Sequence, residues 1–137
     1  MPELIEKACN LFPIRLIKTI RLKIQYIEEL LFQPDLNLKV IFLVRDPRGA
    51  MRSRSSMDWC TSPSCANLFQ VCEDLDSDVD NAFNLGKNYG NHIILIRYED
   101  LSMQPYKTMD KLIKFLELPD QPEFIDTYLK THTGQLR

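Results

Sequence analysis

The sequence lacks several features that define common classes of protein. It has no apolar run close to the roughly 20 residues that a membrane-spanning helix needs. Its first residues, MPELIEKACNLF, are acidic and amphipathic, unlike the basic and then apolar start of a signal peptide. It also has no GxxxxGK[ST] motif, because its GK pair, Gly86-Lys87, has Asn81 five residues before it and Asn88 after it. These absences argue against a membrane span and a Walker-type phosphate loop in these residues.

The chain has no excess of positive charge and no recognisable set of metal ligands. Its 17 Lys and Arg residues face 19 Asp and Glu residues, a formal net charge of −2, whereas nucleic-acid-binding domains carry a basic excess. We therefore expect no nucleic-acid partner, and any phosphate recognition must be local. The two histidines do not stand at zinc-ligand spacing from the cysteines. The acidic residues in 73–80 lack the spacing and mid-loop Gly of an EF-hand, so no metal site is expected.

Four cysteines are present, at Cys9, Cys60, Cys65 and Cys72, without a CxxC pair. They fit free thiols in a reducing cytosol, and they fit a disulfide-closed loop in an oxidising lumen equally well. The sequence has no Asn-x-Ser/Thr glycosylation site that could indicate the compartment. Composition leaves both interpretations open.

The stretch with the most chemical information is residues 39–54, KVIFLVRDPRGAMRSR. Its apolar start is typical of a strand that is buried on both faces of a parallel sheet. Pro47 then ends the strand and suits the first turn of a helix, for which Asp46 is a reasonable N-cap. Arginines at such a strand–helix junction favour an anion, because ligands bind at the carboxyl ends of parallel strands.

The rest of the sequence predicts an α/β fold, with a central parallel sheet of at least three strands flanked by helices. Helices alternate with strands along the chain, and Pro or Gly residues mark the boundaries. We expect helices at 2–12, 22–32, 47 to about 57, 67–85, 105–117 and 123–130, strands at 14–20, 40–44 and 92–97, a loop at 58–66, and a turn bracketed by Gly86 and Gly90.

Arg45 and Ser53 are the first candidates for an anion site. If Arg45 ends the strand, Ser53 lies in the second turn of the following helix, and the two side chains can hold one phosphate from two sides. The alternative is that Arg45 pairs with Asp46 or Glu99, and that Ser53 only packs.

Residues 44–54, VRDPRGAMRSR, resemble the 3′-phosphate-binding motif of sulfotransferases that use 3′-phosphoadenylyl sulfate (PAPS). The arrangement of Arg-Asp-Pro-Arg, with Ser eight residues after the first Arg, is specific. LIKTIRL at 16–22, RYEDL at 97–101 with Pro105, and YLKTHT at 128–133 resemble the Golgi carbohydrate 6-O-sulfotransferases, which act on galactose, N-acetylglucosamine or N-acetylgalactosamine. The resemblance covers nearly the whole chain but only the C-terminal part of that family's P-loop-like domain.

This resemblance implies roles for individual residues. Arg45 and Ser53 would hold the 3′-phosphate of PAPS, with Arg48 as a further cofactor-binding residue, and Tyr98 would lie against the adenine side. Lys18 would be the catalytic lysine that points at the sulfuryl group. The alternatives are a core tyrosine for Tyr98 and a surface strand lysine for Lys18. Cytosolic relatives carry a histidine two residues after that lysine, where this sequence has isoleucine, so the general base is unassigned, with the two histidines candidates by residue type alone.

The implied reaction transfers a sulfuryl group from PAPS to a hydroxyl, the 6-O position, of a glycan or proteoglycan acceptor. The family's 5′-phosphosulfate-binding part is not in this sequence, so residues 1–137 are expected to be a C-terminal portion of one sulfotransferase domain. The family resemblance further implies a Golgi membrane protein with a lumenal domain, an anchor outside this chain, and pairing among the cysteines. The alternative is a noncatalytic fragment or pseudoenzyme that binds adenosine 3′,5′-bisphosphate-type nucleotides.

Overall fold

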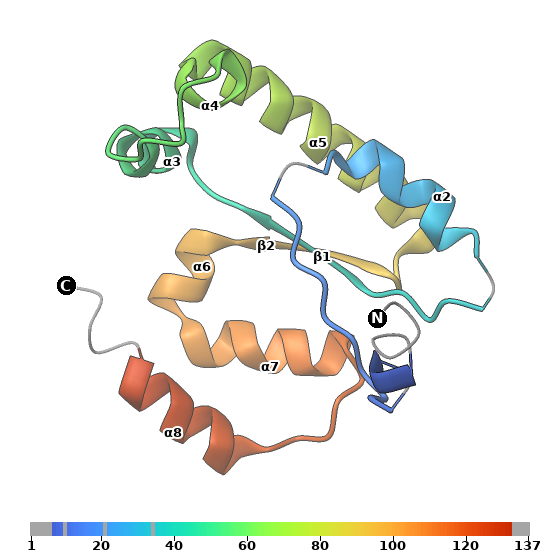
Figure 1. Cartoon of the computed structure of the whole chain (residues 1–137). Helices are drawn as coiled ribbons and strands as arrows, with labels where there is room; N and C mark the ends of the chain where they lie inside the picture. Colours follow the sequence, from blue (N-terminus) through green and yellow to red (C-terminus); the bar gives the residue numbers. More distant parts are fainter. Residues whose placement is uncertain (1–6, 10, 21, 34, 133–137) are drawn as a thin grey trace.

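The computed structural model describes residues 7–9, 11–20, 22–33 and 35–132. Within these ranges the sheet has two parallel strands, β1 (Val40–Val44) and β2 (Ile93–Arg97). Val40 is opposite Ile93 and Val44 is opposite Arg97, so the strands are in register from end to end. Their carboxyl ends therefore lie side by side, each followed at once by a helix (Figure 1).

A helical crossover connects the two strands, as parallel pairing requires. It consists of α3 (Pro47–Arg54), α4 (Pro63–Ala66) and the long α5 (Leu68–Tyr89). Side chains cap the first and last of these helices: Asp46 accepts a hydrogen bond from the Arg48 amide, and Asn67 accepts from the Phe69 and Gln70 amides. The predicted strand at 40–44, the Asp46 cap and Pro47 at the first turn are all confirmed.

The small core lies between α5, β2 and the short helices that precede β1. These helices are η1 (Ile24–Ile27), a 3₁₀ turn, and α2 (Glu28–Leu31). The core consists of buried Ile24, Ile27, Ala82, Leu85 and Ile93. Because the turn carries two of these residues, it fastens the chain before β1 to α5.

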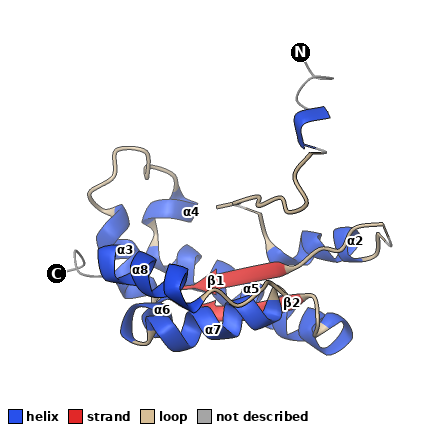
Figure 2. Cartoon of the chain, turned by 90° about the horizontal axis from the view of Figure 1, so that it is seen from below, coloured by secondary structure: helices blue, strands red, loops and turns tan. Residues whose placement is uncertain are grey.

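Three helices follow β2, namely α6 (Tyr98–Met103), α7 (Pro105–Phe115) and α8 (Pro122–His132). Figure 1 shows α5 on one side of the sheet and α6 and α7 on the other, so the strands form the middle layer. Seen from below in Figure 2, α3, α6 and α8 gather on the side where both strands end. The strand ends are thus bordered by helices from both layers.

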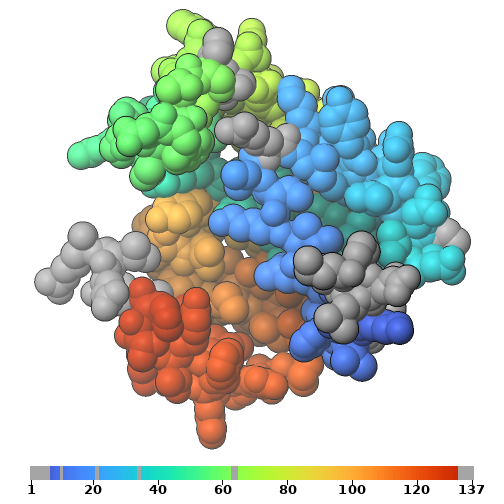
Figure 3. All heavy atoms as spheres, in the orientation of Figure 1, coloured from blue at the N-terminus to red at the C-terminus, as the bar shows by residue number. Residues whose placement is uncertain are grey.

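The strand predicted at 14–20 was wrong, and the sheet has no third strand among the described residues. A strand needs a partner for its backbone groups, and Figure 2 shows this segment standing clear of β1 and β2. Leu16, Ile17 and Ile20 are 90%, 84% and 80% exposed, and Figure 3 shows the segment (blue) on the molecular surface. The segment has the β-branched pattern of a strand, but no strand of the described chain pairs with it.

Other boundaries also differ from the sequence prediction. The helix expected at 22–32 is a 3₁₀ turn followed by one turn of α-helix, α4 lies inside the expected loop, and α6 was not predicted. The predicted turn at Gly86 was wrong, because α5 continues through it to Tyr89. Gly90 then follows the helix, where a Cβ atom would lie 2.9 Å from the Gly86 carbonyl oxygen. Most of the helix expected at 2–12 lies outside the described residues.

Candidate functional site

The sheet register brings Arg45 and Tyr98 together. Arg45 follows β1 directly, and Tyr98 is the first residue of α6 after β2. The Arg45 guanidinium carbon lies 4.4 Å from the centroid of the Tyr98 ring, a cation–π contact. Among the described residues no carboxylate pairs with Arg45, so the pairing with Asp46 or Glu99 that the sequence left open does not form. Arg45 is thus an exposed cation held by an aromatic ring.

The face of α3 that meets Arg45 also carries Ser53. A Cβ atom on Gly49 would lie 3.4 Å from the Arg45 Nε atom, so this glycine position faces the arginine side chain. Ser53 is four residues further along the same helix and therefore on the same face, one turn on. Arg45 and the exposed Ser53 side chain therefore lie along one face of α3.

Arg48 has a different environment, because Asp46 engages it. The Asp46 carboxylate accepts from the Arg48 backbone amide at 2.9 Å and from the Arg48 guanidinium at 2.6 Å. These hydrogen bonds from Arg48, the side chain first, lower the pKa of Asp46 from 3.8 to about 2. Asp46 thus keeps its charge at neutral pH, and its closest donors belong to Arg48 and not to Arg45.

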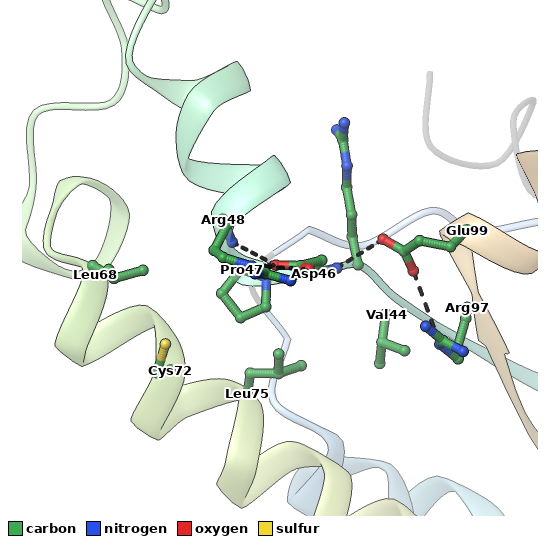
Figure 4. Close-up of a pocket in the computed structure, with 10 residues that line it drawn as sticks. Val44, Asp46, Pro47, Arg48, Leu68, Cys72, Leu75, Arg97 and Glu99 are labelled. Carbon is green, nitrogen blue, oxygen red and sulfur yellow. Dashed lines mark hydrogen bonds and ion pairs between the residues drawn. The ribbon is translucent and has the colours of Figure 1, made fainter.

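Glu99 connects the two strand–helix junctions, a role that the sequence did not predict. Its carboxylate accepts a hydrogen bond from the Asp46 backbone amide at 2.9 Å. That hydrogen bond lowers the pKa of Glu99. Glu99 also lies 4.0 Å from the Arg97 guanidinium (Figure 4). This hydrogen bond between Glu99 and the Asp46 amide depends on the register of the two strands. The sequence therefore carries no signal for it, apart from the presence of the Tyr-Glu-Asp triplet after the strand.

A hollow of about 460 Å³ opens at this junction. Charged residues of both strand ends line one part, and α5 supplies an apolar wall of Leu68, Cys72 and Leu75 (Figure 4). The hollow thus combines charged groups at the strand ends with an apolar wall.

Of the candidates named from the sequence, Arg45 and Arg48 line this hollow, whereas Ser53, Tyr98, Lys18 and the two histidines are not among its lining residues. Lys18 is exposed in the segment without strand structure and is not among the lining residues. His92 immediately precedes β2, so about five residues, or roughly 16 Å of strand, separate it from the strand ends. The Nδ1 atom of His132 is engaged with the Tyr128 carbonyl oxygen at 2.8 Å, on α8. No base is assigned by these positions.

The structure contains a disulfide, between Cys60 and Cys65, in the connection between α3 and α5. Cys9 and Cys72 are free and exposed. The pairing within this group of cysteines that the family resemblance implied is therefore present. It closes a small loop one segment beyond the helix that carries Ser53.

In the part of the chain that the structure describes, no helix has both the length and the apolar character to cross a membrane. Over the same residues, no group of three His, Cys, Asp or Glu side chains is arranged to hold a metal ion.

Comparison with protein families identifies the class to which this fold and junction belong. The model of the sulfotransferase domain family matches residues 6–135, nearly the whole chain. The chain therefore belongs to the sulfotransferase family.

Individual proteins to which the chain is similar are carbohydrate sulfotransferases. Carbohydrate sulfotransferase 1 of Rattus norvegicus is 34% identical over 119 residues, which cover 75% of this chain and 29% of the relative. Carbohydrate sulfotransferase 4 of Mus musculus is 33% identical over 140 residues, 88% of this chain and 36% of the relative. Carbohydrate sulfotransferase 3 of Tetronarce californica is 27% identical over 123 residues, 78% of this chain and 28% of the relative.

The chain spans about a third of the length of these curated relatives. No solved structure matches it at a significant level.

Proposed function

We propose that this chain carries the 3′-phosphate-binding half of a PAPS-dependent carbohydrate sulfotransferase site. The observation that carries the proposal is Arg45, a cation without a carboxylate partner in the described chain, stacked on Tyr98. The position of Ser53 on the α3 face that borders Arg45 supports a shared phosphate. Arginine matches a phosphate with two parallel hydrogen bonds, and a serine hydroxyl can donate a third.

The residues present fit the 3′-phosphate and the nucleoside of PAPS. Arg45 and Ser53 would hold the phosphate, and Tyr98 or the wall of Leu68 and Leu75 would contact the adenine. Arg48 would border the bound nucleotide with its guanidinium held by Asp46, so its charge is partly compensated. PAPS supplies the activated sulfuryl group and a bisphosphate leaving group. The contribution of this chain is to bind and orient that donor, since such transfers depend on positioning and charge neutralisation.

The acceptor is a glycan or proteoglycan hydroxyl, at the 6-O position if the motif resemblance extends to specificity. In the transfer, the bond between sulfur and the phosphate oxygen breaks while the sugar oxygen bonds to sulfur, and the hydroxyl proton passes to a base. The carbohydrate names of the relatives support this class of acceptor. Lys18 is proposed as the catalytic lysine on its Lys-Thr-Ile motif, and it would have to move to the strand ends to act.

We place residues 1–137 in the C-terminal portion of a single sulfotransferase domain, whose sheet continues with further strands next to β1. β1 pairs on one edge only among the described residues, and Ile41 and Leu43 are exposed on it. The greater length of the relatives supports the same proposal. A Golgi-lumenal location, with the membrane reached through an anchor outside this chain, agrees with the Cys60–Cys65 disulfide, because disulfides persist in oxidising compartments.

Calorimetric titration with adenosine 3′,5′-bisphosphate tests the nucleotide site. We expect Arg45→Ala to weaken binding by about 10- to 150-fold, since a hydrogen bond to a charged group contributes about 1.5–3 kcal/mol. Ser53→Ala should weaken binding by about 2- to 12-fold, as expected for a neutral donor.

Arg52→Ala is the matched control. It removes an exposed arginine from the same helix, one residue before Ser53. If Arg45→Ala and Arg52→Ala weaken binding equally, general charge attraction explains the binding and the site assignment is wrong. If the unaltered chain does not bind the nucleotide, the proposed function is wrong for this chain.

A further inference from the structure

A second hollow, of about 270 Å³, lies between β2 and the helices α6 and α7. It lies on the α7 side of the sheet, whereas the nucleotide hollow is walled by α5, on the opposite side (Figure 1). The two hollows share Arg97, at the end of β2. The lining consists of Leu95, Ile96, Arg97, Asp100, Gln104, Lys107, Thr108 and Lys111. The proposed nucleotide site uses none of these except Arg97, so the second hollow needs its own explanation.

This hollow has a surplus of positive charge in a chain whose net charge is −2. Lys107 and Lys111 stand four residues apart on one face of α7, with Arg97 as a third cation. Asp100 is the carboxylate of the lining, and it lies 3.7 Å from the Arg97 guanidinium. Neither lysine has a carboxylate partner within the described ranges.

Two other lysines nearby are paired with carboxylates, unlike Lys107 and Lys111. Lys114, seven residues after Lys107 on α7, pairs with Asp110 at 2.8 Å, and Lys130 on α8 pairs with Asp126 at 2.6 Å. The sequence therefore supplies a carboxylate one turn before each of these lysines but none for the pair that lines the hollow. An unpaired set of cations around one cavity favours an anionic ligand.

The hollow is lined by aliphatic side chains from β2 and by a buried polar residue of α7, Thr108. Ile96 is buried and Leu95 is half-buried, so β2 offers aliphatic surface. Thr108 is buried and donates a hydrogen bond to the Asp100 carbonyl oxygen at 3.1 Å, which holds α7 against α6. A sugar ring has apolar C–H faces and polar edges, so aliphatic floor and cationic rim together suit a sugar that bears an anion.

We propose that this hollow binds a sulfate ester on a sugar residue of the acceptor glycan, next to the residue that receives the new sulfate. The proposal rests on the proposed function. The product of that reaction is itself a sulfate ester, so on a repeating glycan an earlier product can lie beside the next acceptor hydroxyl. Arg97 borders both hollows, so the two hollows meet at the end of β2, one on each side of the sheet.

Titration with galactose 6-sulfate, galactose and inorganic sulfate tests the subsite, with chemical shifts as the readout. Galactose 6-sulfate should bind more tightly than either of the other two, because it alone offers both the anion and the ring. Lys107→Gln and Lys111→Gln should each weaken binding of galactose 6-sulfate by roughly two- to five-fold, as expected for exposed ion pairs. Added salt should reduce the preference for the sulfated sugar.

Lys114→Gln is the matched control, since it removes the same charge from the same helix at a lysine already paired with Asp110. Equal weakening by Lys114→Gln, or equal binding of galactose and galactose 6-sulfate, overturns the subsite. Inorganic sulfate that binds as tightly as the sugar sulfate overturns the assignment to a sugar.

Adenosine 3′,5′-bisphosphate titrated in parallel separates the two proposals. Nucleotide binding without discrimination for the sulfated sugar overturns the subsite alone. Lysine-dependent binding of the sulfated sugar without nucleotide binding supports the subsite and overturns the proposed nucleotide function. Loss of nucleotide binding in both lysine variants assigns the two lysines to the nucleotide and also overturns the subsite.

Discussion

The ends of β1 and β2 carry similar arginines in different electrostatic surroundings. Arg45, after β1, stacks on Tyr98 and has no carboxylate partner in the described chain. Arg97, at the end of β2, lies 4.0 Å from Glu99 and 3.7 Å from Asp100. Both strand ends lie at the same edge of the sheet, where α/β folds bind ligands. Arg45 is therefore available to a new anion, whereas Arg97 is already partly neutralised.

The difference arises from how the nearby carboxylates are used. At the β1 end, Asp46 is fully engaged by Arg48 and by capping α3. At the β2 end, Glu99 accepts from the Asp46 amide and also lies near Arg97. Each carboxylate thus has partners other than Arg45, although both lie close to it in sequence or space. An arginine in a basic-acidic motif can be free for a ligand when its acidic neighbours have closer donors.

The largest effect is expected from a substitution that weakens the sheet, because the sheet aligns the carboxyl ends of β1 and β2. Ile96 is 3% exposed on β2, and Ile96→Ala should lower the free energy of unfolding by about 2–5 kcal/mol, the cost of removing a buried aliphatic side chain. Urea denaturation followed by circular dichroism measures the change. Leu43→Ala on β1 is the control, since Leu43 is 53% exposed and should cost far less. Equal losses would contradict the assigned packing.

A smaller effect should follow from loosening Arg45 without removing it. Tyr98→Leu keeps an apolar side chain but removes the ring 4.4 Å from the guanidinium. Because an exposed cation–π contact contributes about 0.5–1 kcal/mol, binding of adenosine 3′,5′-bisphosphate should weaken by about two- to five-fold. Tyr106→Leu, at another exposed tyrosine, on α7, should leave the affinity unchanged. An unchanged affinity in Tyr98→Leu would show that the ring does not position Arg45.

The smallest effect should be the pH dependence of the junctions. The pKa of Asp46 falls from 3.8 to about 2 in the folded chain, and that of Glu99 is also lowered. A lowered folded-state pKa stabilises the fold above the unfolded-state value, and this contribution is lost as the pH falls from about 4 towards 2. Asp46→Asn, which can still cap α3, should flatten the stability profile in this window.

Asp58→Asn is the control for that measurement. It changes the net charge equally at an exposed loop residue with no ion pair in the described chain. Thermal unfolding between pH 2 and 5 compares the three proteins. If Asp46→Asn and Asp58→Asn behave alike, the engagement of Asp46 by Arg48 does not contribute to stability.

Local signals allowed the β1 junction to be predicted. An apolar β-branched run, an Asp-Pro pair and the Arg/Ser spacing define the strand, the cap and the candidate grip within 16 residues, numbers 39–54. The helix α5 was also predicted, at 67–85, because its apolar residues repeat at helical spacing; the structure ends it later, at Tyr89. In both segments the local sequence alone determines the secondary structure.

Features that depend on a distant partner were missed or mispredicted. The segment 14–20 has the pattern of a strand, but pairing requires a neighbouring edge that the pattern does not supply. The Glu99 to Asp46 hydrogen bond follows from strand register. The α6 helix was missed because Arg97-Tyr98-Glu99 continues an apolar strand without a Pro or Gly boundary. Tertiary contacts decide the structure of these segments, so local sequence propensity does not predict it.

The most direct test of the central claim is a double-mutant cycle between Arg45 and the 3′-phosphate of the ligand. Calorimetry would compare adenosine 3′,5′-bisphosphate with adenosine 5′-monophosphate on the unaltered chain and on Arg45→Ala. We predict that the unaltered chain prefers the bisphosphate by about tenfold or more, and that Arg45→Ala removes most of this preference. A preference that survives intact in Arg45→Ala would contradict the account, because the 3′-phosphate would then be held elsewhere.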